Sequence, residues 1–144
     1  MGIVLAVGSR TEPGRLGDHL AGSAEAPGHL RRLGMRAVTL RPLVGTDVGT
    51  IMTMINYENN ADFAASWGRL AGDAEWQAFA ARTAQGGASV QVESSLFADV
   101  DPSFQPSADR PMGVVMTTQW RAKPGRLLDF MGNVMTSVIS SAPA

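Results

Sequence analysis

The chain has 144 residues, of which 44% are hydrophobic and 17% are charged, and its formal net charge is −1. This size and composition indicate one soluble globular domain that is long enough to bury a core. Without clustered Lys and Arg it is not expected to bind nucleic acid, and without cysteine it can form no disulfide and no thiolate metal site. No apolar run approaches the ~20 residues of a membrane span, and the start lacks the basic region of a signal peptide, so we expect a cytoplasmic protein with no membrane partner.

The chain opens with a predicted strand followed by a helix. Ile3–Val7 is a continuous apolar run, which is typical of a strand that is covered on both faces. Thr11 can cap the following helix. The prolines and glycines within this helix predict a break near Pro27 and an end near Leu33.

Two further strands are predicted after this helix. The more polar run Met35–Val44 carries Pro42 near its end, which suits a strand at the edge of a sheet. A connection of turn-forming residues follows and predicts a hairpin. The hairpin leads into Thr50–Tyr57, a strand that is apolar on both faces.

Two helices and a fourth strand complete this part of the chain. Asn59 or Asn60 can cap the first helix, and Asp73 can cap the second, which ends at a pair of glycines. Residues 88–97 then alternate between apolar and polar side chains, the pattern of a half-exposed strand.

Residues 113–133 repeat the pattern of residues 2–22, shifted by 111 positions. Both copies contain an apolar run, a Pro-Gly turn and a helix start, with Arg15 in the first copy and Arg126 in the second. An arginine at a helix N-terminus can bind an anion, although a turn preserved in a duplication is the simpler explanation. We predict a domain over 1–104, a linker over 105–112 and a partial second copy over 113–144, with a strand at 114–120 and a helix at about 125–138.

The predicted order β-α-β-β-α-β, followed by β-α, matches the ferredoxin-like α+β fold with an extra C-terminal unit. In that fold the helices cover one face of the sheet. The second face then needs another cover, because it carries Val4, Ala6, Met52 and Met54. A second subunit would supply this cover in a two-fold dimer, whereas the extra strand and helix are too few to cover four strands. We expect a homodimer or higher homo-oligomer, with the extra strand extending the sheet edge or crossing to the partner subunit.

The segments NADFAASWGRLAGDAEWQAFAAR and FADVDPSF carry a resemblance to a known superfamily. Asp73–Phe79 is similar to the Asp-Pro-Glu-Trp-Gln-like segment of NIPSNAP-type members of the dimeric α/β-barrel superfamily, with Ala74 in place of the usual proline. That superfamily also includes cofactor-independent monooxygenases of antibiotic biosynthesis, cyclases, isomerases, haem-handling enzymes and members without known activity. The resemblance implies a dimer with a cavity between sheet and helices, and it leaves the reaction open.

Histidine and tyrosine could supply acid–base chemistry near such a cavity. His19 in the first helix could face the cavity as a base, or it could be a partly exposed helix residue. Tyr57 ends the third strand beside Asn56 and could donate a hydrogen bond to a substrate oxygen, or it could only pack its ring. His29 lies beside two arginines and is interpreted as a surface residue. Two histidines and no cysteine argue against a closed zinc site, and we predict no metal and no cofactor.

The remaining candidates lie on the strands and on one helix. If the valines of residues 88–97 face the helices, Gln91 and Glu93 face the dimer cavity, where Glu93 could be a base or form an inter-subunit salt bridge. Trp67 lies on an apolar helix face, where a core role is favoured over stacking on a planar ligand. Met52 and Met54 would give the cavity an adaptable lining or simply fill the core.

Together these residues predict an enzyme-like small-molecule site for proton transfer, cyclisation or oxygenation of a planar, partly apolar substrate. Glu93 or His19 would be the base, and Tyr57 with Asn56 would stabilise a developing oxyanion. The predicted substrate-binding residues are Asn56, Trp67, Gln91, Met52 and Met54. The alternative is a non-catalytic, NIPSNAP-like binding or assembly module, in which the C-terminal unit swaps between subunits and methionines fill the cavity.

Overall fold

The computed structural model describes residues 2–45, 48–98 and 121–134. The chain divides into two compact units, Met1–Ala108 and Asp109–Ala144. Within the described ranges, none of the helices combines the length and the apolar character that a bilayer crossing requires. The predicted linker over 105–112 and the predicted strand at 114–120 lie outside the described residues, so the proposed domain boundaries stay predictions.

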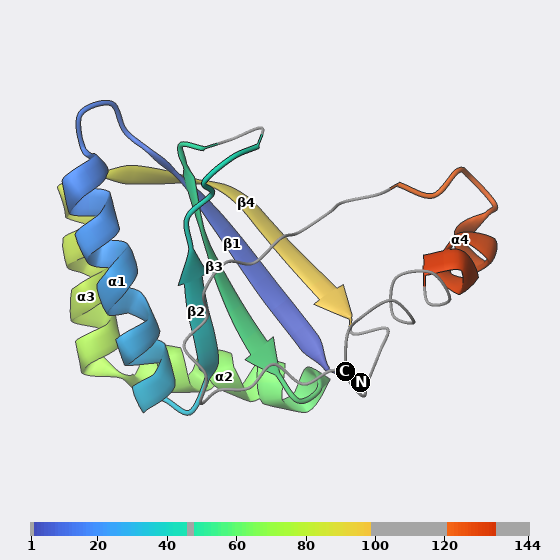
Figure 1. Ribbon diagram of the computed structural model, residues 1–144. Coiled ribbons are helices and arrows are strands. Elements are labelled where there is room, and N and C mark those ends of the chain that lie inside the picture. The colour runs from blue at the N-terminus through green and yellow to red at the C-terminus, as the bar shows by residue number, and fades with distance from the viewer. Residues whose placement is uncertain (1, 46–47, 99–120, 135–144) are drawn as a thin grey trace, which may run out of the picture. The chain divides into compact units, whose positions relative to one another are not determined.

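Four antiparallel strands form the sheet of the first unit, in the order β2-β3-β1-β4 (Figure 1). The strands are β1 (Ile3–Thr11), β2 (Arg36–Leu40), β3 (Thr50–Tyr57) and β4 (Ser89–Ala98). The helices are α1 (Leu16–Arg32), which follows β1, and α2 (Asn60–Gly72) and α3 (Ala74–Gly86), which follow β3. This arrangement confirms the predicted ferredoxin-like α+β fold, with β2 at one edge of the sheet as expected.

β1 is longer than the apolar run that predicted it. Gly8 does not end the strand, because the backbone from Ser9 to Thr11 continues to pair with β4, where Thr11 lies opposite Ser89. The register shifts between Gly8 and Ser9, since β4 contains one extra residue, Val92, at this point. Such a bulge reverses which face of the sheet the following residues occupy.

The predicted break in the first helix is wrong, because α1 runs without interruption for 17 residues. Pro27 lacks the N–H that would bond the preceding turn, a loss that costs a helix interior about 3 kcal/mol. However, Pro27 and Leu30 are both buried, and Leu30 belongs to the core cluster. Tertiary burial of this face therefore offsets a local preference that favours a break.

The next two helices begin at the residues that the sequence indicated. The side chain of Asn59 accepts hydrogen bonds from the backbone N–H groups of Ala61 and Asp62, at 2.9 and 3.0 Å. The carboxylate of Asp73 accepts one from Trp76 N–H at 2.7 Å. Gly87 ends α3 with φ +58°, a left-handed conformation that glycine adopts without a steric penalty. These caps are local, which is why both helix starts could be predicted.

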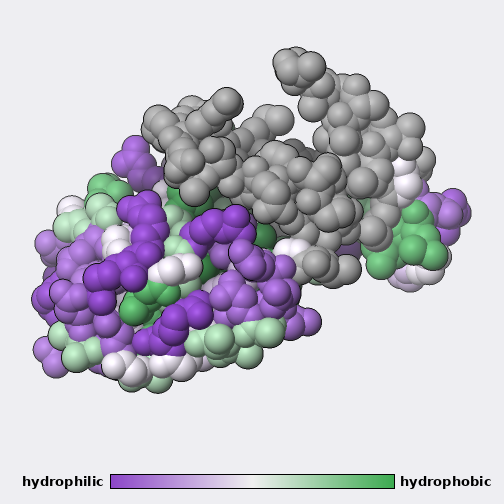
Figure 2. All heavy atoms as spheres, turned by 90° about the horizontal axis from the view of Figure 1, so that it is seen from below, coloured by the Kyte–Doolittle hydropathy of each residue, from purple (hydrophilic) through white to green (hydrophobic). Residues whose placement is uncertain are grey.

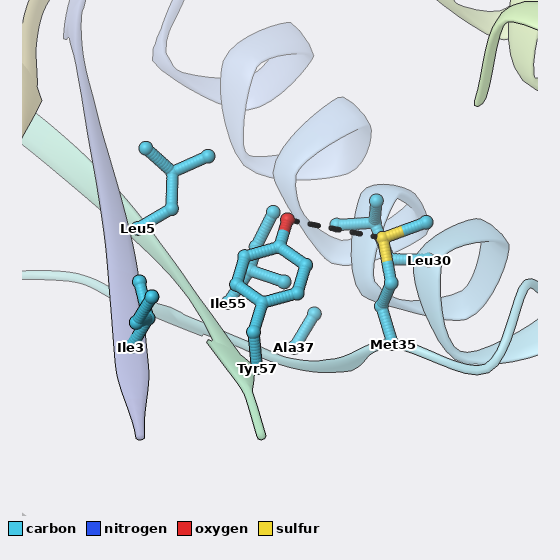
Figure 3. Packing of buried hydrophobic residues seen from close by; sticks show 7 residues of the cluster. All are labelled: Ile3, Leu5, Leu30, Met35, Ala37, Ile55 and Tyr57. Carbon is cyan, nitrogen blue, oxygen red and sulfur yellow. Dashed lines mark hydrogen bonds between the residues drawn. The ribbon is translucent and has the colours of Figure 1, made fainter. Parts of the chain in front are cut away.

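The core lies between the sheet and the helices (Figure 3). β1 and β3 point alternate apolar side chains toward α1, and the residue Met35 just before β2 joins them. The buried cluster consists of Ile3, Leu5, Leu30, Met35, Ala37, Ile55 and Tyr57. Since three strands and one helix contribute to this cluster, it fixes the side of the sheet on which the cavity described below can form.

The second unit contains one described helix, α4 (Leu127–Val134), and its start repeats the start of α1. Gly14 and Gly125 both have φ +75°, as a Pro-Gly type II turn requires. The Arg15 guanidinium binds a carboxylate three residues on at 2.7 Å, and Arg126 does the same at 2.5 Å. The two copies therefore share local geometry, and each arginine is engaged by its own helix.

Candidate functional site

A cavity of about 510 Å³ lies between the sheet and the helices of the first unit. Alternate residues of β1 line it, namely Leu5, Val7 and Ser9, and α1, α2 and α3 all contribute side chains. This volume falls within the range of about 300–1,000 Å³ that is usual for small-molecule sites. Figure 2 shows polar residues over much of the described surface, with apolar residues visible between them.

Aromatic side chains form part of the cavity wall. Tyr57, Trp67, Trp76 and Phe79 line it, and Phe63 makes edge contacts with Tyr57 and Trp67 at ring-centroid distances of 5.2 and 6.1 Å. Trp67 is 54% exposed, so the core role favoured for Trp67 is wrong. The reason is that Phe63 fills the space between Trp67 and the sheet. Trp67 therefore presents its indole at the opening of the cavity.

His19 is held at one end of the cavity by Thr11. The Thr11 hydroxyl and His19 Nδ1 lie 2.7 Å apart, while Nε2 has no hydrogen-bond partner among the described residues. His19 is only 6% exposed and lines the cavity. Burial lowers the pKa of His19, because a charged imidazole would lose hydration. His19 is therefore a neutral, oriented imidazole near pH 7.

The strand residues beneath His19 are also polar. Ser9 on β1 lies opposite Gln91 on β4. The next pair on the same face is Thr11 on β1 with Ser89 on β4. Residues directly opposite each other in antiparallel strands share a face, and Ser9, Ser89 and Gln91 all line the cavity. The predicted candidates His19 and Gln91 thus come together at one polar end.

Tyr57 lines the same cavity but lies at the other end. It is paired with Ile3, six residues along β1 from Ser9, or about 20 Å at 3.3–3.4 Å per residue. Its hydroxyl donates to Met35 Sδ at 4.0 Å (Figure 3), and burial raises the pKa of Tyr57. His19 and Tyr57 therefore cannot act together on one small reacting group, as the sequence interpretation assumed.

The remaining candidates lie on the opposite face of the sheet. Gly8 pairs with Met52 on one side and with Glu93 on the other, and a Cβ built on Gly8 would lie 3.3 Å from the Cβ of Glu93. Met54 and Asn56 share this face by register. The expectation that Gln91 and Glu93 share a face is wrong, because the bulge at Val92 separates them. Glu93, Asn56, Met52 and Met54 therefore do not line the cavity that holds His19.

Sequence reasoning missed Thr11 as a site residue and misplaced His29. Thr11 was interpreted as a helix cap, although Ser9 and Thr11 continue the alternation of Leu5 and Val7, a signal that could have placed them on the cavity face. His29 is partly buried, not a surface residue, and its ring packs on Phe79 with a centroid distance of 4.8 Å.

Among the residues that the structure describes, no three acidic, His or Cys side chains are grouped to hold a metal ion.

Comparisons with known proteins agree with this fold. The NIPSNAP family model matches residues 10–103. No curated protein matches the chain in sequence.

Solved structures of the same fold include two NIPSNAP proteins and an oxygenase. The NIPSNAP family protein from Agrobacterium tumefaciens has a TM-score of 0.59 and 24% identity, over 71% of this chain and 89% of its own. An uncharacterized NIPSNAP domain protein from Burkholderia xenovorans has a TM-score of 0.56 and 23% identity, over 74% and 100%. SnoaB, a cofactor-independent oxygenase from Streptomyces nogalater, has a TM-score of 0.52 and 10% identity, over 72% and 98%. Identities this low show a shared fold and no more.

Proposed function

The chain belongs to the NIPSNAP family, and from that premise we propose that it is an enzyme that binds a planar, partly apolar molecule in the cavity and moves a proton through His19. The chemistry needs no bound cofactor, because the imidazole itself accepts and returns the proton. The ligand lies against the aromatic wall, and its reacting group lies at the polar end.

The environment of His19 is the observation that carries this proposal. Thr11 engages Nδ1 at 2.7 Å, so Nε2 is the nitrogen that a ligand in the cavity can meet. When Nδ1–H donates to the Thr11 hydroxyl, Nε2 carries the lone pair that a general base needs. The lowered pKa of His19 keeps this nitrogen unprotonated near pH 7.

Polar residues at the same end of the cavity as His19 can stabilise the negative charge that proton removal leaves on the ligand. Ser9 and Gln91, which lie opposite each other on β1 and β4, can both donate hydrogen bonds to an oxygen that gains charge as the proton leaves. Trp67 can stack on a planar ring at the opening. A structural neighbour, SnoaB, is itself a cofactor-independent oxygenase, which supports the view that this fold can work without a cofactor.

A second candidate function is a non-catalytic binding or assembly module, and the far face of the sheet favours it. Val90 and Phe97 are 54% and 49% exposed, and the register places both on the face away from the helices. We propose that a homodimer covers this face and that the protein acts in the cytoplasm. Native mass spectrometry tests the dimer, because a monomer at micromolar concentration would contradict it.

The catalytic proposal is tested by proton exchange in a planar ketone. In D₂O, the wild-type protein should accelerate the exchange of deuterium for hydrogen at C1 of 2-tetralone. The loss of the C1 proton signal in ¹H NMR spectra measures the rate. His19→Asn should lose about a hundredfold or more of this acceleration, because general bases contribute roughly 10²–10⁴-fold. His29→Asn is the matched control, since His29 does not line the cavity, and it should keep the wild-type rate. Equal rates in both variants would refute the role of His19.

A further inference from the structure

We infer that the cavity selects an uncharged ligand and excludes carboxylates of the same shape. The polar end of the ligand would lie at His19, and its apolar body would lie toward Leu5 and Ile55. This inference rests on the proposed function, because it concerns the ligand of the same cavity.

The described residues that line the cavity include no cationic side chain for an anionic ligand. Among the described residues that line it, Asp18 has the only formally charged side chain. Arg15 binds the Asp18 carboxylate at 2.7 Å, and both side chains are largely exposed. Arg69 is near Tyr57, but it does not line the cavity and binds Asp62 at 3.1 Å. A bound carboxylate would therefore find only neutral hydrogen-bond donors.

Neutral polar groups are gathered at one end of the cavity, whereas Leu5 and Ile55 line the other end together with Tyr57, whose hydroxyl is bonded to Met35 Sδ. Ser9, Gln91 and His19 lie where β1 and β4 pair beyond the bulge. From Ser9 to Leu5 the cavity floor extends over four residues, or about 13 Å at 3.3 Å per residue. That length suits a ligand of two or three fused rings. Such a ligand can place one polar group at His19 while its rings contact Leu5, Ile55 and the aromatic wall.

Proton transfer creates a new pair of charges in the cavity, in addition to the Asp18 carboxylate that Arg15 already binds. The ligand O–H or C–H bond breaks, an N–H bond forms at His19 Nε2, and the electron pair stays on the ligand, so one anion and one imidazolium arise together. Each is then the counterion of the other. A ligand that enters already charged would have to give up hydration without this compensation, and an unpaired buried charge is costly. The same arrangement thus favours a neutral ligand before the transfer and stabilises the ion pair after it.

A matched pair of probes tests this inference. 2-Naphthamide and 2-naphthoate have nearly the same shape and differ by one negative charge at pH 7.5. In isothermal titration with the full-length protein, the amide should bind at least about tenfold more tightly than the carboxylate. Gln91→Lys places a cation on the cavity wall and should tighten naphthoate binding about fivefold to tenfold, as expected for one new ion pair of roughly 1 kcal/mol. Glu93→Lys is the control, because it makes a larger change in net charge on the same strand but on the opposite face.

The outcomes separate the inference from the proposed function. If both probes bind wild type equally, or if both lysine variants improve naphthoate binding to the same degree, charge selection by the cavity is overturned. If neither probe binds and His19→Asn leaves 2-tetralone exchange unchanged, the proposed function fails, and this inference fails with it. A preference for the amide that Gln91→Lys reduces and Glu93→Lys leaves unchanged supports the inference.

Discussion

Replacing Thr11 by Val should destabilise the first unit by about 1–2 kcal/mol, because His19 Nδ1 would lose its hydrogen-bond partner. The bond length of 2.7 Å and the 6% exposure of His19 mean that water cannot easily replace the hydroxyl. Leaving a buried polar atom unpaired costs roughly 1–3 kcal/mol. The lower part of this range applies, since Thr11 itself is partly exposed. Valine has the branched shape of threonine and favours strands, so β1 should not be weakened by its backbone preference.

Urea denaturation followed by tryptophan fluorescence measures this change. The melting temperature should also fall by about 4–8 °C per kcal/mol. Thr11→Ser keeps the hydroxyl and should retain most of the stability that Thr11→Val loses. Thr53→Val is a matched control, because Thr53 also lines the cavity but bonds Thr39 at 3.0 Å and not His19. The His19 pKa, followed by NMR, should be lower in Thr11→Val than in wild type, because the imidazolium loses an acceptor. Wild-type stability together with an unchanged His19 pKa in Thr11→Val would refute the reasoning.

Two further predictions concern packing and pH. Phe79→Ala should lower the free energy of unfolding by about 3–5 kcal/mol, as is usual for a buried phenylalanine. Val48 is exposed, so Val48→Ala should change this free energy by less than about 0.5 kcal/mol. Burial lowers the pKa of His19 in the folded state below its ordinary value of 6.5. The imidazole therefore binds a proton more readily in the unfolded chain than in the folded one, so the free energy of unfolding should decrease as the pH falls below about 6.5. Urea titrations from pH 7.5 to 5 should show this loss in wild type and a smaller one in His19→Asn. An identical pH dependence in the two proteins would contradict it.

The residues that were predicted well are those whose structure depends on near neighbours in the chain. Asn59 and Asp73 cap their helices through contacts two or three residues away. Gly14 and Gly125 adopt the same φ in the two copies of the Pro-Gly turn, since the turn needs no tertiary contact. His19 lies on the cavity wall, although the sequence left open whether it would be exposed.

The interpretations that failed depend on pairing between distant segments. Pro27 does not break α1, because the buried face of the helix outweighs the lost hydrogen bond. Gln91 and Glu93 lie on opposite faces, because β4 has one more residue than β1 at the bulge, and alternation along β4 alone cannot reveal it.

Hydrophobic periodicity and capping residues were enough to predict the order of the elements and the ferredoxin-like fold, because each acts over a few residues. The family resemblance came separately, from short segments such as Asp73–Phe79. Only the tertiary structure decided which polar side chains share a cavity. The register of β1 against β3 and β4 puts Tyr57 beside Ile3 and Gln91 beside Ser9, and packing of α1 brings His19 onto Thr11. A site depends on distances across the sheet, and these follow from strand pairing and helix packing that no single segment encodes.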